Sequence, residues 1–110
     1  MATPRPGARV RGSRSGRPIM AALELLSRRW ALRVLWELRG DPLTFRALRE
    51  ACDEVSPSVL NARLAELKDA GIVETTPGGY TLTASGSSLM RALGSLKRWS
   101  AEWARQLAKG

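Results

Sequence analysis

Hydrophobic residues recur at helical spacing in four stretches of the chain, separated by short breaks. In residues 19–38 they share one face that ends at a Gly-Asp-Pro sequence, which predicts one long helix. Thr44 is a suitable N-cap for a second, shorter helix that ends near Ala51. In the second helix we expect Phe45, Leu48 and Cys52 to turn inward. The residues at helical spacing in the first are Leu23, Leu26, Trp30, Val34 and Leu38.

The third stretch contains VSPSVLNARLAEL, residues 55–67. Ser56 can cap the first turn and Pro57 suits the first helical position, while Gly71 readily takes the left-handed conformation that ends a helix. Leucines form the inner face of this predicted helix. Its outer face is small and polar, which allows close approach of a large object such as the major groove of DNA. A solvated helix that is poor in charge explains the pattern equally well. The outer residues are Ser58, Asn61, Ala62 and Ala65.

Two β-prone segments follow, residues 72–75 and 80–82, and the Thr-Pro-Gly-Gly between them predicts a hairpin. A last helix is predicted over residues 84–108. Its hydrophobic residues alternate in steps of four and three, which favours a partner helix across a two-fold axis over packing within one chain. The fold class expected is therefore mainly α with a small β-hairpin, a winged helix-turn-helix with a long C-terminal dimerisation helix. The expected dimer-interface residues are Leu89, Leu93, Leu96, Trp99, Ser100, Trp103 and Leu107.

Charge divides the chain into an arm and a domain. The sequence has 18 Lys and Arg against 10 Asp and Glu, a net charge of +8, and its first 18 residues hold five arginines and no acid. Rich in Pro, Gly and Ser as well, residues 1–16 are expected to be a disordered arm, and residues 17–110 one small domain. The arm adds contacts to DNA phosphates or the minor groove, or it is a solvated tail.

Several functional classes are excluded by composition. There is no histidine, and the single cysteine, Cys52, is more simply a small core residue than a reactive thiol. We therefore expect no enzyme activity, no metal site and no cofactor. No apolar run approaches the ~20 residues of a membrane span, so no membrane partner is expected and the predicted location is the cytoplasm.

Four motifs in this order resemble the HxlR-type winged helix-turn-helix transcriptional regulators, relatives of the MarR group. The resemblance covers residues 17 to about 100. It rests on PIMAALELLSRRW, on LTFRALREACDEVSPSVLNARLAELKDAGIVE, on YTLTASG and on the place and length of the terminal helix.

The resemblance implies a homodimer that binds double-stranded operator DNA, with a palindromic site and repression as the expected form of regulation. Residues 56–70 would be the recognition helix and the hairpin the wing. Asn61 suits adenine, Ser58 a base or phosphate, and Ala62 a thymine methyl. Arg63 would contact a phosphate or form a salt bridge to the neighbouring helix, and Arg46 would hold a phosphate or remain a solvated charge. The expected DNA-binding residues are Thr44, Arg46, Ser56, Ser58, Asn61, Ala62, Arg63, Thr76, Gly78 and Gly79.

The sequence also departs from the family. Arg17 stands where many members have a cysteine, which excludes thiol sensing there, and residues 72–90 contain no Lys or Arg, which weakens phosphate binding by the wing. The arginine arm is a plausible replacement. If so, deleting residues 2–16 should flatten the salt dependence of DNA binding, and an unchanged slope of log K against log salt would exclude this role.

Two further possibilities remain open from sequence alone. The first is a winged-helix protein-interaction module whose terminal helix recruits a partner while the groove-facing side is unused. The second is a small-molecule effector, unidentified, bound between the first and last helices beside a wall of tryptophans, although packing in the core is the simpler role for these side chains. The tryptophans concerned are Trp30, Trp36, Trp99 and Trp103.

Overall fold

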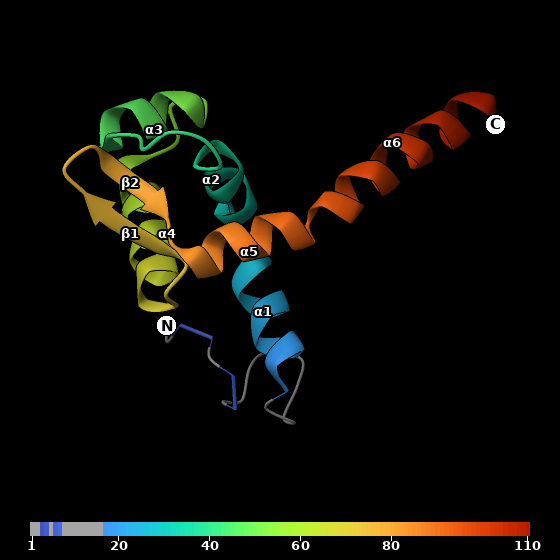
Figure 1. Cartoon of the computed structure of the whole chain (residues 1–110). Helices are drawn as coiled ribbons and strands as arrows, with labels where there is room; N and C mark the ends of the chain where they lie inside the picture. Colours follow the sequence, from blue (N-terminus) through green and yellow to red (C-terminus); the bar gives the residue numbers. More distant parts are fainter. Residues whose placement is uncertain (1–2, 5, 8–16) are drawn as a thin grey trace.

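The computed structural model describes residues 3–4, 6–7 and 17–110, and the expected disorder of the arm concerns residues that lie mostly outside them. The chain is mainly helical with one antiparallel hairpin, which confirms the winged-helix fold (Figure 1). No helix in the described ranges is both long and apolar enough to cross a membrane. The elements are α1 (Pro18–Leu26), α2 (Ala31–Glu37), α3 (Phe45–Ala51), α4 (Pro57–Asp69), β1 (Val73–Thr76), β2 (Gly79–Leu82), α5 (Ala84–Ala92) and α6 (Gly94–Lys109).

The single long helix predicted over residues 19–38 is wrong, because the chain turns between α1 and α2. The Ser27 hydroxyl donates to the carbonyl of Glu24, 2.9 Å away, and Trp30 has a left-handed φ of 73°. Hydrophobic periodicity continues through this turn, and for that reason the break was not predictable from the spacing of apolar residues. Leu23, one of the residues at helical spacing, lies exposed on α1.

The predicted caps of the helix-turn-helix are confirmed. The Thr44 hydroxyl accepts a hydrogen bond from the N–H of Ala47 at 3.1 Å, and the Ser56 hydroxyl accepts one from Val59 at 3.3 Å. Because these caps satisfy donors that helices leave unpaired, they define where α3 and α4 begin. The fully buried side chains between these helices and α2 are Val34, Leu35, Leu38, Leu48, Cys52, Leu60 and Leu67.

Cys52 is buried, as predicted for a core residue. Burial raises the pKa of its thiol, because a thiolate is poorly solvated among apolar side chains. The reactive form is therefore scarce near neutral pH.

The wing is attached to the body of the domain by a backbone bridge. β1 and β2 pair from Val73 opposite Leu82 to Thr76 opposite Gly79. Leu43, just before α3, exchanges hydrogen bonds with Tyr80, at 3.0 Å and 2.7 Å. Gly79 has a φ of +122°, and a Cβ there would lie 2.3 Å from the Leu43 carbonyl oxygen. Only glycine fits this contact, so Gly79 serves the docking of the wing.

The Thr-x-x-Gly of YTLTASG joins the wing to α5. The Thr83 hydroxyl accepts from the N–H of Gly86 at 3.1 Å and donates to the carbonyl of Gly71 at 2.6 Å. A Cβ at Gly86 would lie 2.3 Å from the backbone oxygen of Ile72. The first turn of α5 can therefore lie against the start of the hairpin only because residue 86 has no side chain.

Replacing Gly86 by Ala is expected to lower the free energy of unfolding by about 1–3 kcal/mol, the usual cost of overpacking. The backbone of Ile72 cannot move without disturbing the hairpin, which is why the added methyl group is not absorbed. Gly94→Ala is the control, because nothing lies within 4 Å of a Cβ at that helical position. It should be neutral or slightly stabilising. Urea unfolding of both variants checks this, and equal stabilities would contradict it.

The last helix, predicted as one unit over residues 84–108, is also divided. α5 ends at Ala92 and α6 begins at Gly94, with Leu93 between them. Glycine has low helix propensity, and its position after Leu93 accounts for the interruption. α5 packs on α2 and β2, whereas α6 extends away from the rest of the molecule (Figure 1). No residue of α6 is buried.

Candidate nucleic-acid interface

The outer face of α4 is a free surface of short side chains. Ser58, Asn61 and Ala62 are exposed. On the opposite face of the helix, Leu60 and Leu64 are buried. Ser56 is exposed at the start of the helix, and its hydroxyl lies 3.0 Å from that of Ser58. Because no long side chain covers this face, the edges of bases in a major groove can approach the helix backbone.

The turn between α3 and α4 is held by two arginines from outside it. Asp53 and Glu54 have left-handed φ values of 56° and 61°, which are unusual for residues other than glycine. Arg49 Nε donates to the Val55 carbonyl at 2.7 Å. Arg33 of α2 donates to the Ala51 carbonyl at 2.7 Å. These bonds stabilise the sharp turn that sets the angle between α3 and α4.

Arg33 also has two acidic partners. Its guanidinium lies 3.2 Å from Glu37 and 3.2 Å from Asp53. The hydrogen bond to Glu37 and the attraction of Asp53 raise the pKa of Arg33, so it remains fully charged. α2 is thus connected electrostatically to the turn as well as packed against α4.

One carboxylate on α4 serves two arginines in a largely buried cluster. Glu66 pairs with Arg28, from the turn between α1 and α2, and its Oε1 lies 3.0 Å from Arg63 Nε. The three side chains are only 9–19% exposed. Arg63 also donates to the carbonyl of Arg29 at 3.4 Å. Neither Arg28 nor Glu66 was predicted as a functional residue, because no local pattern reveals partners 38 residues apart.

The structure therefore places Arg63 in an ion-pair cluster. Of its two predicted roles, the salt bridge is the one observed, although the partner is on the same helix rather than a neighbouring one. Its guanidinium is turned toward the body of the domain, away from the short outer side chains of α4. Arg63 thereby helps to fix the orientation of α4.

The residues at the start of α3 are exposed. The Arg46 side chain is 92% exposed and its Nε lies 3.4 Å from Glu50, an exposed pair that contributes little to stability. Thr44 is exposed too, with its hydroxyl used for the cap. Arg46 can therefore reach a phosphate, and only its weak contact with Glu50 would be lost.

The wing residues are not equally accessible. Gly78 is exposed at the tip, but Gly79 is partly covered by its contact with Leu43. Thr76 is half-buried and its hydroxyl donates to the Gly79 carbonyl at 2.9 Å. The surface that the wing can offer to DNA is therefore mainly backbone around Gly78.

The predicted dimer-interface residues fall into two groups. Leu89 packs with the core of its own chain and Leu93 is half-buried, whereas the residues on α6 are exposed. Trp99 and Trp103 stack on each other with ring centroids 5.4 Å apart. We call Leu96, Trp99, Trp103 and Leu107 the α6 stripe; its members are 49–64% exposed. Ser100 lies among them, also exposed.

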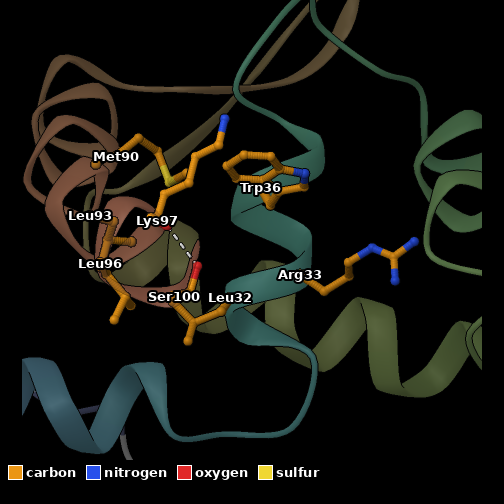
Figure 2. Close-up of a pocket in the computed structure, with 9 residues that line it drawn as sticks. Leu32, Arg33, Trp36, Met90, Leu93, Leu96, Lys97 and Ser100 are labelled. Carbon is orange, nitrogen blue, oxygen red and sulfur yellow. Dashed lines mark hydrogen bonds between the residues drawn. The ribbon is translucent and has the colours of Figure 1, made fainter. Parts of the chain in front are cut away.

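The four tryptophans do not form a common wall between the first and last helices. Trp30 packs against the core, and Trp99 and Trp103 stack on the outer part of α6. Only Trp36 of the four lines a cavity found beside α5 and α6 (Figure 2). Within the described ranges, no cluster of three His, Cys, Asp or Glu side chains is suitable for a metal ion.

Comparison with known proteins agrees with this geometry. Residues 25–108 match a family model described as HxlR-like helix-turn-helix. YvaP, an HTH-type transcriptional regulator of Bacillus subtilis, is 33% identical over 89 residues, which cover 74% of this chain and 82% of that protein. YodB, an HTH-type transcriptional regulator of the same organism, is 31% identical over 87 residues, covering 73% and 78%.

Solved structures give the same result. The crystal structure of quinone-bound YodB from B. subtilis superposes with a TM-score of 0.72 at 30% identity, covering 76% of this chain and 96% of that one. A transcriptional regulator of the MarR family from Enterococcus faecalis V583 superposes with a TM-score of 0.75 at 29% identity, covering 92% and 98%.

Proposed function

The chain belongs to the HxlR-like helix-turn-helix family of transcriptional regulators, and from this premise we propose that it is a repressor that binds a palindromic operator as a homodimer. The observation that carries the proposal is the outer face of α4. Its short polar side chains are exposed while its leucines and Glu66 fix the helix to the domain. Such a helix can enter a major groove without rearranging the core.

Base contacts are assigned to the exposed residues of α4. The side-chain amide of Asn61 can make a bidentate contact with adenine. Its N–H group donates to N7, and its oxygen accepts from the N6 amino group. Ser58 reaches a base or a phosphate, and Ala62 contacts a thymine methyl group. Ser56 lies at the helix start, where the N–H groups and the helix dipole favour a phosphate.

Backbone contacts are assigned to α3 and the wing. Thr44 and Arg46 are exposed beside α4, and Arg46 brings a positive charge to a phosphate. Thr76, Gly78 and Gly79 form the tip of the wing, where the backbone around Gly78 is the accessible part. Arg63 acts through the orientation of α4. The arginine arm adds contacts to DNA phosphates or to the minor groove. Most of its residues lie outside the described ranges.

The homodimer is supported by the α6 stripe. Two tryptophans and two leucines are 49–64% exposed to solvent on a helix that leaves its own domain, which is costly for a monomer in water. Pairing the stripe with its copy across a two-fold axis buries these side chains. A two-fold dimer presents two α4 helices related by the same axis, which is why the operator should be palindromic.

We expect Asn61→Ala to weaken binding to the operator by about 1–3 kcal/mol, roughly 5- to 150-fold, since one bidentate base contact is lost. Binding to random duplex should change little, because it depends on phosphate contacts. Ser88→Ala is the control, a similar loss of a short polar group at an exposed position of α5. Quantitative gel shifts on both duplexes measure the effect. An equal loss on random DNA would remove Asn61 from base recognition.

A further inference from the structure

A groove lies between α1 and α5, and the described residues of the arm lie against it. Pro4 is buried there, and Pro6, although exposed, also lines the groove. Together with the groove residues these two prolines enclose a cavity of about 210 Å³. In Figure 1 this part of the arm, in dark blue, lies beside α1 and below α4. The arm therefore contacts the domain ahead of most of its arginines.

The groove suits a thin apolar segment. Three of its lining residues are alanines, Ala21 and Ala22 of α1 and Ala70 at the end of α4, and their short side chains leave room close to the backbone. Among the described residues no charged side chain lines the groove, and no member of the α6 stripe does. Filling the groove therefore leaves the proposed dimer interface free. The larger apolar residues that complete the lining are Leu25, Leu26, Ile72 and Leu89.

The sequence of the arm favours binding in such a groove. Proline has no N–H group that would be left unpaired among apolar side chains, and its fixed φ means that little conformational freedom is lost on binding. The chain turns directly afterwards. Gly7 has a φ of +85°, the left-handed value required at the second central position of a type II turn, and Pro6 suits the first. A short segment can therefore hold its place.

Both ends of the arm lie at this groove. Pro18, the first residue of α1, lines it together with the two prolines of the arm. Ala70 also lines it, so the point of attachment is next to the C-terminal end of α4. The segment that connects the two ends, residues 8–16, carries Arg9, Arg11 and Arg14.

We propose that the groove between α1 and α5 is the binding site of the chain's own N-terminal segment, which attaches through Pro4 and Pro6 and fastens the start of the arginine arm to its own domain. The arm's positive charge is thereby kept near the end of α4. Fastening also lowers the entropy that the arm loses when it contacts phosphates. That consequence rests on the proposed DNA-binding function, whereas the attachment itself does not.

The test is paramagnetic broadening in nuclear magnetic resonance spectra of the isotope-labelled full-length protein. Ala2→Cys carries a nitroxide next to the attached segment, and Cys52 is buried, so it does not take up the label. We expect strong broadening of amide signals from three sides of the groove, at Ala22, Ala70 and Ser85. Signals at Gly78, on the tip of the wing, should stay sharp. Reducing the nitroxide should restore all signals.

Two further substitutions in the labelled chain test the contact itself. Pro4→Ser removes the buried ring and should abolish the broadening; residue 4 is outside every helix and strand, so the domain stays folded. Ala22→Leu fills the groove from α1 and should abolish it too. Ala101→Leu is the matched control, the same substitution at an exposed position of α6 opposite the α6 stripe, and should retain the broadening.

Three results would overturn the proposal. The first is the absence of selective broadening at the groove, which would make the arm a free tail. The second is broadening that persists in both Pro4→Ser and Ala22→Leu. The third is broadening only between a nitroxide on one chain and isotope on another, which would place the segment on a partner's groove. Since the experiment contains no DNA, its failure is distinct from failure of the proposed function.

Discussion

Replacing Glu66 by Gln is expected to lower the free energy of unfolding by about 3–5 kcal/mol, the typical cost of removing one partner from a buried ion pair. Arg28 and Arg63 are only 9% and 19% exposed, and both pair with this carboxylate. Neutralising it leaves two positive charges close together and poorly solvated. The loss falls on the cluster that joins α4 to the turn between α1 and α2, so DNA binding should weaken as well.

Urea unfolding followed by circular dichroism measures this effect. Glu74→Gln is the matched control, because Glu74 is an exposed residue of β1, and it should change stability by less than about 0.5 kcal/mol. If the free energy of unfolding of Glu66→Gln lay within about 1 kcal/mol of that of the unmodified protein, water and not Glu66 would be stabilising the charges of the two arginines. The assigned role of the cluster in orienting α4 would then be wrong.

Replacing Trp103 by Ala is expected to weaken the homodimer by about three orders of magnitude. A tryptophan at the centre of an interface commonly contributes about 2 kcal/mol or more, and a two-fold interface loses the contact twice. About 4 kcal/mol corresponds to roughly a thousandfold change in the dissociation constant. Trp103 is 49% exposed in the single chain and stacks on Trp99, so its loss removes much of the apolar area available to a partner.

Sedimentation equilibrium over a concentration series tests this prediction. Arg105→Ala is the control, since Arg105 lies on the side of α6 opposite the α6 stripe and should leave the dimer intact. Operator affinity should fall with the dimer, because each half-site alone provides one α4 helix. A dimer unaffected by Trp103→Ala would show that the α6 stripe is not the interface.

Local features of the fold were predictable because their causes are local. The caps at Thr44 and Ser56 and the left-handed Gly71 depend on residues within a few positions. The hairpin was likewise predicted to within one residue at each strand end. Both long helices were predicted too long, because hydrophobic periodicity continues through the turns at Trp30 and Leu93 and no proline marks either break.

Contacts between distant segments were not predictable from the sequence. Glu66 falls among residues of ordinary helix-forming character, and only the folded chain brings Arg28 to it. Gly86 is the last residue of the YTLTASG motif, but the reason for a glycine there, the close approach to Ile72, depends on the docking of α5 against the hairpin. Exposure of Asn61 followed from the helical pattern, whereas the inward turn of Arg63 depends on where α1 ends.

The most direct test of the proposed function is binding of the purified protein to fragments of its own promoter region, compared with random duplex over a salt series and followed by footprinting. A dimer that reads sequence through α4 should protect a two-fold symmetric site and bind it at least ~10³-fold more tightly than random DNA. Binding that is equal on all sequences and lost at physiological salt would contradict this account. It would favour instead a winged-helix module that uses the α6 stripe to recruit another protein.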